Sequence, residues 1–275
     1  MALKDITLGQ YFPGKSRIHL LDPRTKLIVL VGYIVALFMA KNWISYGICL
    51  AFLAACIVIS TIPLKSIVKG MKPLVVILVF TGVLNIFFTV GEGDPLVDFW
   101  IFTVYKDGLI RAVFMVVRIL LLISGTFLLT YTTSPISLTD GLESLMNPLK
   151  VLKVPVHELS MMMCIALRFI PTLIEETDKI MSAQKARGAD FENGSLMERA
   201  KALIPILVPL FISAFRRADE LATAMECRCY TGGSGRTRMN VLHAGAKDVL
   251  ACLVLVLLGA AVLALNHLGG HALSW

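Results

Sequence analysis

The chain has 275 residues, of which 57% are hydrophobic and only 16% are charged, and its mean hydropathy is +0.78. A soluble domain averages about 45–50% apolar and about 25% charged residues, so the composition excludes a soluble domain, a disordered chain, a collagen-like fibre and a small disulfide scaffold. The net charge of +7 is compatible with nucleic acid, but anionic lipid headgroups and membrane topology explain it equally well. The composition therefore predicts a membrane protein.

Five apolar stretches are long enough, or nearly so, to form helices across a bilayer, which takes about 20 helical residues. They cover residues 27–40, 44–62, 73–90, 109–131 and 249–267. The first is short and would depend on Lys26 and Lys41, which flank it, extending toward the lipid headgroups. The predicted fold class is an all-α polytopic membrane protein with about five transmembrane helices and amphipathic cytoplasmic helices.

The distribution of Lys and Arg predicts the orientation, because cytoplasmic connections carry the excess of these residues. Five precede the first stretch, one follows it, three follow the second, one follows the third and fourteen lie within residues 132–248, with none after. This alternation predicts a multi-pass protein of the cell membrane with a cytoplasmic N-terminus and an external C-terminus. It also divides the chain into residues 1–131 with four spans, a cytoplasmic region 132–247, and residues 248–275 with the last span and an external tail.

The cytoplasmic region mixes apolar and charged residues at helical spacing, and we expect breaks at its six prolines. One helix face is rich in methionine, including Met162 and Met163. Such a stripe is either core packing, the more common case, or an adaptable contact surface. A second apolar run, residues 203–215, is too short to span and contains Pro205 and Pro209. We interpret it as a helix that lies against the membrane or the spans.

An internal repeat aligns residues 178–188 with residues 219–229, at an offset of 41. Asp178 matches Asp219, and Arg187 matches Arg228. Each copy is therefore predicted to be a helix that begins with an acidic residue and reaches an Arg near its end.

Either Arg taken alone has a structural explanation, because an Arg in the last turn complements the helix dipole and a following Gly ends the helix. Two matching copies favour a docking role, since a guanidinium binds carboxylates and backbone carbonyls in a protein groove. Gly188 directly follows Arg187, whereas the second helix is expected to run on to Gly232.

The sequence resembles the transmembrane T component of energy-coupling factor (ECF) transporters over nearly the whole chain. The resemblance rests on separated motifs that occur in order: Pro13-Gly14, His19-Leu-Leu-Asp22-Pro23-Arg24-Thr-Lys26, Thr132-Thr133-Ser134-Pro135, Leu167-Arg168-Phe169-Ile170-Pro171, Ala183-Gln-Lys-Ala186-Arg187-Gly188-Ala-Asp-Phe191 and Phe215-Arg216-Arg217-Ala218-Asp219. The family's first signature is Ala186-Arg187-Gly188. The second reads Cys227-Arg228-Cys229, which keeps the Arg but lacks the flanking Ala and Gly.

This resemblance implies a subunit that docks two ATPase subunits on cytoplasmic coupling helices and contacts a membrane-embedded S component, which binds a vitamin or a metal ion. It implies that the two signatures dock the ATPases, with Arg187 and Arg228 each entering a groove on one of them and Asp178 and Asp219 supporting the helices. ATP-driven closure of the ATPase pair would then reorient the S component. ATP and Mg would be used by the partners, and we expect no catalytic residue, cofactor or metal on this chain and no nucleic-acid partner.

Arg111 and Arg118 lie seven residues apart in the fourth apolar stretch and share a helix face. An ionisable residue inside a span is a functional candidate by default, although Arg111 is close enough to the outer end to extend to the interface. Arg118 lies about 10 Å deeper. It has either a polar partner that locks helix packing or a transport role in a water-filled interior.

Two other classes of function stay open on the sequence alone. A self-contained secondary transporter or channel is the main alternative, but such transporters carry inverted repeats within their spans, and the repeat here is direct and cytoplasmic. An intramembrane enzyme is weaker, because the spans lack a nucleophile–base pair and metal-ligand spacing. Cys227 and Cys229 form a weak metal motif without a nearby His, and the glycines of residues 232–237 lack the Gly-Lys-Ser/Thr ending of a phosphate-binding loop.

Overall fold

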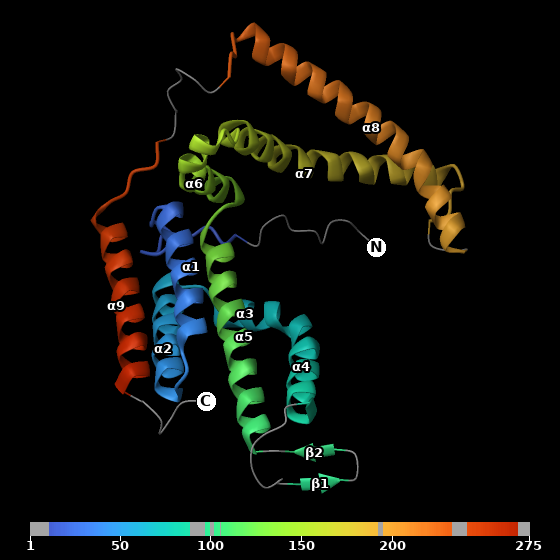
Figure 1. Cartoon of the computed structure of the whole chain (residues 1–275). Helices are drawn as coiled ribbons and strands as arrows, with labels where there is room; N and C mark the ends of the chain where they lie inside the picture. Colours follow the sequence, from blue (N-terminus) through green and yellow to red (C-terminus); the bar gives the residue numbers. More distant parts are fainter. Residues whose placement is uncertain are drawn as a thin grey trace. The chain divides into compact units, whose positions relative to one another are not determined.

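The computed structural model describes residues 11–88, 97–99, 102–104, 106–191, 195–232 and 241–268. These residues are helical almost throughout (Figure 1), which confirms the predicted all-α fold class. The elements in chain order are α1 (Pro23–Met39), α2 (Trp43–Ser60), α3 (Leu64–Met71), the 3₁₀ helix η2 (Lys72–Leu74), α4 (Val75–Phe88), β1 (Val97–Phe99), β2 (Phe102–Val104), α5 (Lys106–Thr132), α6 (Pro135–Met146), the 3₁₀ helix η3 (Asn147–Leu152), α7 (Val156–Ala186), α8 (Leu196–Cys227) and α9 (Ala246–Leu268).

The described residues fall into two compact units. One lies within residues 143–241, and the other combines residues 11–142 with residues 242–268. The first contains α7 and α8. The second contains α1 to α5 and α9, so the N-terminal helices and the C-terminal helix belong to one bundle.

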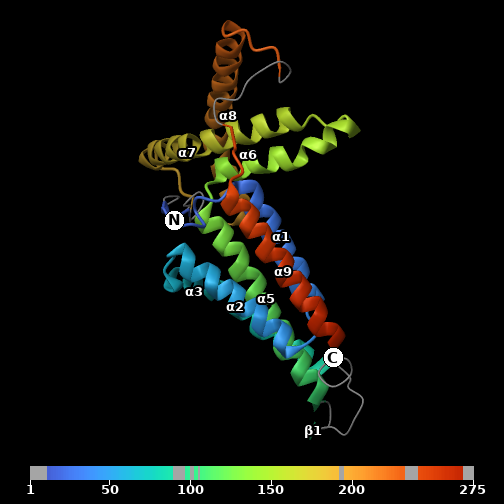
Figure 2. The ribbon, with the colours of Figure 1, turned by 90° about the vertical axis from the view of Figure 1, so that its left-hand side faces the viewer.

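The helices α1, α2, α5 and α9 pack side by side in this bundle (Figures 1 and 2). Apolar side chains from all four helices form its core, in which Leu37, Tyr131 and Val262 are almost completely buried. The outward faces are also apolar, and Val58 of α2 and Val256 of α9 on them are largely exposed. A helix surface that is apolar on its exposed side is typical of contact with lipid.

Two glycines allow close helix approach within the bundle. A Cβ atom on Gly32 of α1 would lie 2.6 Å from Cδ2 of Leu255 in α9. A Cβ atom on Gly125 of α5 would lie 3.0 Å from Cε1 of Tyr33 in α1. Small residues commonly bring helix backbones together in membranes, and here they bring α1 close to α9 and α5.

Five helices of the described residues are long and apolar enough to cross a bilayer: Trp43–Ser60, Leu64–Ile86, Gly108–Thr132, Val156–Ala186 and Ala246–His267. Four of these coincide with predicted spans. The fifth is α7 in place of residues 27–40, because α1 has only 17 residues, close to the lower limit for a span. The second half of α7 carries charged residues, including Glu175, Asp178 and Lys185, which is typical of a helix exposed to water.

Some elements between α2 and α5 were not predicted. Thr61 ends α2 in the left-handed conformation, with φ of 59°, and α3 begins after Pro63. The third apolar helix therefore begins about nine residues earlier than the sequence suggested. In the segment predicted only as an external connection, β1 and β2 form an antiparallel hairpin with Val97 opposite Val104.

Asp22 and Pro23 start α1, as a capping acid followed by a proline commonly does. The Asp22 side chain accepts a hydrogen bond from the Arg24 N–H at 2.9 Å, and Pro23 is the first helical residue. The Asp22 N–H in turn donates to Oδ1 of Asp248 at 2.9 Å. This bond joins the beginning of α1 to the beginning of α9.

Lys26 is 7% exposed, and its Nζ donates to three oxygens. The acceptors are the carbonyl of His19 at 3.2 Å, the carbonyl of Thr132 at 2.9 Å and the hydroxyl of Thr133 at 3.2 Å. The prediction that Lys26 extends to lipid headgroups is wrong, because all three of its N–H groups have partners inside the bundle. Lys26 instead holds the segment before α1 against the end of α5.

The first unit contains two long continuous helices. Pro171 lies inside α7, and Pro205 and Pro209 lie inside α8, so the predicted breaks at these prolines are wrong. A proline removes one helical hydrogen bond and bends the axis, and the long helical segments on both sides preserve the helix. A capping box starts α8: the Glu198 N–H donates to the Ser195 hydroxyl, and the Ser195 N–H donates to the Glu198 carboxylate.

The methionine stripe on α7 does not form a core in the described residues. Met162 is 54% exposed and Met163 is 45% exposed. The core-packing interpretation is therefore wrong for these two side chains, and the alternative of a contact surface remains.

Candidate functional site

The Ala-Arg-Gly signature forms the end of α7. Arg187 is the cap residue, and Gly188 follows with φ of 87°. The Gly188 N–H donates to the carbonyl of Lys185, and the Ala189 N–H donates to the carbonyl of Gln184, each at 3.0 Å. This pair of bonds is a Schellman motif, which satisfies carbonyls that the last helical turn leaves open.

The end of α8 has the same construction. Arg228 is the cap residue, and Cys229 follows with φ of 56°. The Cys229 N–H donates to the carbonyl of Glu226 at 2.8 Å, and the Tyr230 N–H donates to the carbonyl of Met225 at 3.0 Å. Both helices therefore end one residue before the arginine, through equivalent hydrogen bonds.

The prediction that the second helix runs on to Gly232 is wrong. Cys229 takes the left-handed conformation that Gly188 takes in the first copy, although a side chain in that conformation costs about 1–2 kcal/mol. The hydrogen bonds of the motif are made by the backbone, so they form with either residue. The loss of glycine from the second signature adds strain at Cys229 and leaves the helix end in place.

Arg187 and Arg228 are exposed, and the helix ends that they follow lie at separate ends of the pair of α7 and α8 (Figure 1). The structure thus presents two similar but distinct arginine sites. Asp178 lies within α7 and Asp219 within α8, nine residues before each arginine. The prediction that each copy is a separate helix beginning with an acid is wrong, because each copy is the last part of a helix of more than 30 residues.

A polar contact joins α7 to α8. Nη2 of Arg217 donates to Oε2 of Glu176 at 2.9 Å, and the hydroxyl of Ser213 donates to the other carboxylate oxygen. This contact was not predicted, but the offset of the repeat contained a signal for it. Glu176 and Arg217 are also 41 residues apart, each two residues before the first aspartate of its copy, and they carry opposite charges.

The contact lies at the same distance along the chain from both arginine sites. Arg187 follows Glu176 by eleven residues, and Arg228 follows Arg217 by eleven residues, which corresponds to about 16 Å along each helix. The prolines of α7 and α8 all precede the contact. Since sharp helix bends occur mainly at prolines, the segments that lead to the arginines lack the usual cause of a sharp bend and are of equal length.

A family model described as cobalt transport protein (CbiQ) matches residues 14–239. Three relatives carry the name energy-coupling factor transporter transmembrane protein EcfT. The relative from Clostridium kluyveri is 55% identical over 256 residues, which is 93% of this chain and 95% of the relative. The relative from Acidaminococcus fermentans is 52% identical with the same coverage, and that from Bacillus subtilis is 48% identical over 258 residues, 94% and 97% of the two chains.

This chain belongs to the EcfT family. It is the transmembrane component of an energy-coupling factor transporter, as the sequence resemblance led us to expect. The family match includes both arginine signatures and the helices that carry them.

In this EcfT family member, Arg118 is held by polar and aromatic groups inside the bundle. Its Nε donates to Oη of Tyr46 at 2.7 Å, and Nη2 lies 3.5 Å from the carbonyl oxygen of Ala40. The guanidinium carbon also lies 5.6 Å from the ring centre of Phe38 and 5.7 Å from that of Tyr46. These contacts join α5 to α1 and α2, and they favour the helix-packing role over a transport role.

Arg111 is exposed and does not share the contacts of Arg118. The described residues contain no group of three or more His, Cys, Asp or Glu side chains that could hold a metal ion. Cys227 and Cys229 are exposed free thiols. The arginine ends of α7 and α8, by contrast, are exposed and alike in construction.

Proposed function

We propose that this chain couples two ATPase subunits to a membrane-embedded S component that takes up a vitamin or a metal ion. In this proposal the residues 186–188 dock one ATPase and the residues 227–229 dock the other. The chain itself is not an enzyme and holds no cofactor. ATP and Mg are bound and used by the partners.

The observation that supports this proposal is that α7 and α8 end in the same way. Both present an exposed arginine from the cap of a Schellman motif, and both lie eleven residues beyond the contact between α7 and α8. Two similar partners require two similar sites. The planar guanidinium of an exposed arginine can donate several hydrogen bonds to acceptors in a groove of a partner protein.

The proposed mechanism uses the helix pair to transmit motion. Closure of the ATPase pair on ATP displaces Arg187 and Arg228 together with the helix segments behind them. The S component responds because it contacts one arrangement of the helices better than the other, and a ligand shifts an equilibrium only through such a difference in affinity. The distribution of basic residues supports a cytoplasmic N-terminus and an external C-terminus, which puts α7 and α8 on the ATPase side.

The test replaces both arginines, in the variant Arg187→Gln/Arg228→Gln, in cells that express the whole transporter. We expect loss of ATPase co-purification with this chain and loss of uptake. The matched control is Arg199→Gln/Arg216→Gln, which removes two other exposed arginines of α8 and is expected to leave both measurements unchanged. Normal co-purification and normal uptake in the first variant would refute the docking role.

A second measurement separates this proposal from a self-contained transporter or channel. Vesicles that contain only the purified chain should show no flux of substrate above that of empty vesicles. Flux through the chain alone would contradict the coupling role, whatever the arginine variants do.

A further inference from the structure

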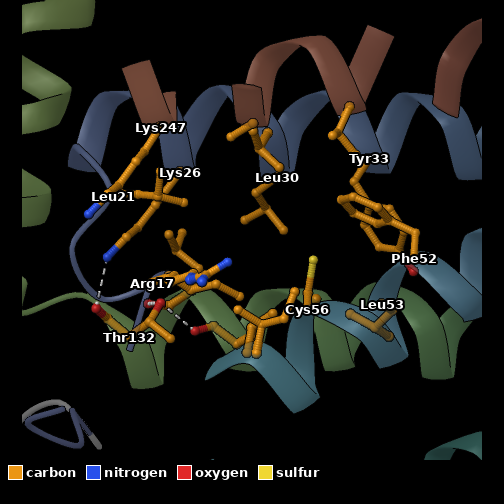
Figure 3. A pocket seen from close by; sticks show the side chains of 18 of the residues that line it. Arg17, Leu21, Lys26, Leu30, Tyr33, Phe52, Leu53, Cys56, Thr132 and Lys247 are labelled. Atoms are coloured by element: carbon orange, nitrogen blue, oxygen red, sulfur yellow. Dashed lines mark hydrogen bonds between the residues drawn. The ribbon is translucent and has the colours of Figure 1, made fainter. Parts of the chain in front are cut away.

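A cavity of about 610 Å³ lies between α1, α2, α5 and α9 in the helix bundle (Figure 3). Its volume falls within the range of about 300–1,000 Å³ that is usual for small-molecule sites. Apolar side chains from the four helices form most of its wall, among them Leu30, Phe52, Leu128 and Val254. The arginine sites of α7 and α8 do not contribute to it.

The cavity has a basic end and an apolar end. Arg17, Lys26 and Lys247 lie at the end where α1 and α9 begin, and Figure 3 shows Tyr33 and Phe52 at the opposite end. Lys26 and Tyr33 are seven residues apart on α1, so the apolar part is about 10 Å long. The wall therefore changes from cationic to hydrocarbon over the length of about two helical turns.

The three basic side chains differ in what they can offer to a ligand. The N–H groups of Lys26 are all engaged by oxygens within the bundle, so Lys26 contributes charge only. The neighbouring carboxylates Asp22 and Asp248 do not line the cavity, and they accept hydrogen bonds from backbone N–H groups. Arg17 and Lys247 are exposed, and their donors are available to an anionic group.

We propose that this cavity binds an anionic phospholipid. The phosphate lies between Arg17 and Lys247, and an acyl chain enters the apolar part between the helices. Basic pockets between transmembrane helices on the cytoplasmic side commonly bind anionic headgroups. This basic end belongs to the same side as the N-terminal segment, whose five Lys and Arg residues favour the cytoplasm.

A phospholipid explains both halves of the wall at once. A small hydrophilic anion would leave the apolar half in contact with water, which is unfavourable for a hydrocarbon surface of this extent. A neutral lipid would leave the charges of Arg17 and Lys247 without a counterion. An anionic headgroup on an acyl chain matches the charge at one end and the hydrocarbon at the other.

The first experiment blocks the apolar part. The full chain, purified in detergent, is titrated with dioleoyl-phosphatidylglycerol or dioleoyl-phosphatidylcholine, and binding is followed by native mass spectrometry and by the rise in melting temperature. We expect binding of phosphatidylglycerol in preference to phosphatidylcholine. Ala251→Trp places an indole in the cavity and should abolish the preference, whereas Val256→Trp on the exposed face of the same helix should retain it.

The second experiment removes the basic groups without filling the cavity. Arg17→Gln/Lys247→Gln should weaken phosphatidylglycerol binding about 30-fold, since each basic residue near an anionic headgroup contributes about a fivefold factor. Lys15→Gln/Lys65→Gln removes the same charge from exposed residues outside the cavity and should change binding less than threefold. Equal binding of the two lipids by the wild-type chain, or equal losses in the two charge variants, would overturn the proposal.

Discussion

Replacement of Arg217 by Met tests whether the contact between α7 and α8 holds the helix pair together. The change removes the guanidinium that donates to Glu176 at 2.9 Å, and Met preserves most of the apolar stem. We expect α7 and α8 to separate more easily, with no change at the two helix ends, whose hydrogen bonds are made by backbone groups.

The magnitude follows from the exposure of the pair. A hydrogen bond between charged groups contributes about 1.5–3 kcal/mol when it is enclosed, and an exposed ion pair contributes about 0.2–1 kcal/mol. The Arg217 side chain is 35% exposed and that of Glu176 is 24% exposed. Because solvent screens a pair of this exposure in part, we expect a loss of about 1 kcal/mol, or a fivefold shift in the opening equilibrium.

Amide hydrogen exchange of the full chain in detergent measures this shift directly. Amides of α7 and α8 around the contact should exchange about fivefold faster in Arg217→Met. Arg216→Met is the matched control, because Arg216 is the neighbouring residue on α8 and its side chain is exposed. Equal exchange in the two variants, or no change in either, would refute the stabilising role of the pair.

Three further predictions concern single positions. Arg118→Met should lower the free energy of unfolding by about 2 kcal/mol through the lost charge-assisted hydrogen bond, whereas exposed Arg111→Met should change the melting temperature little. Cys229→Gly should raise stability by about 1 kcal/mol by relieving its left-handed conformation, measured by exchange at the end of α8. The hydrogen bond from the backbone N–H of Ser195 lowers the pKa of the Glu198 carboxyl. The capping box is therefore fully formed above the ordinary pKa of about 4.3, and it weakens as the pH falls through the lowered pKa. Hydrogen exchange at the start of α8 should become faster in acid, and Glu198→Gln should remove that pH dependence.

The sequence was sufficient to predict the features of the fold that depend on a local pattern of residues. Four of the apolar stretches overlap helices that can cross a bilayer, although the third of these helices begins about nine residues early. Hydropathy over about 20 residues determines whether a helix is stable in lipid. The cap of α1 at Asp22 and Pro23 is a signal of the same local kind, since helix capping involves residues that are close in sequence. The arginine ends of α7 and α8 were recognised through their repeat for the same reason.

Features that depend on distant partners were not predicted. Lys26 directly precedes an apolar stretch, as a residue that extends to the headgroups would. Its ammonium group instead donates to oxygens of Thr132 and Thr133, more than 100 residues away, inside the bundle. The sequence allowed two interpretations of Arg118, and its hydrogen bond to Tyr46 on another helix favours the helix-packing role. In both cases the decisive group lies on another helix, and no periodicity within a single helix identifies it.

The errors at the helix breaks have a different cause. Pro171 inside α7 was taken as an interruption, yet a single lost hydrogen bond does not end a helix of 31 residues. Cys229 was judged unable to end α8 because glycine is the usual residue in the left-handed conformation. The two backbone hydrogen bonds of the motif form with Cys229 in that conformation, so the helix ends there.

The equal spacing of the two arginines from the contact between α7 and α8 has a kinematic consequence. A straight rod that rotates about a fixed point displaces its tip in proportion to the length beyond that point. With about 16 Å of helix beyond the contact on each side, a rotation of about 10° moves either arginine by roughly 3 Å. Arg187 and Arg228 therefore move equally far for equal rotations, so the two proposed docking sites would transmit displacements of the same size.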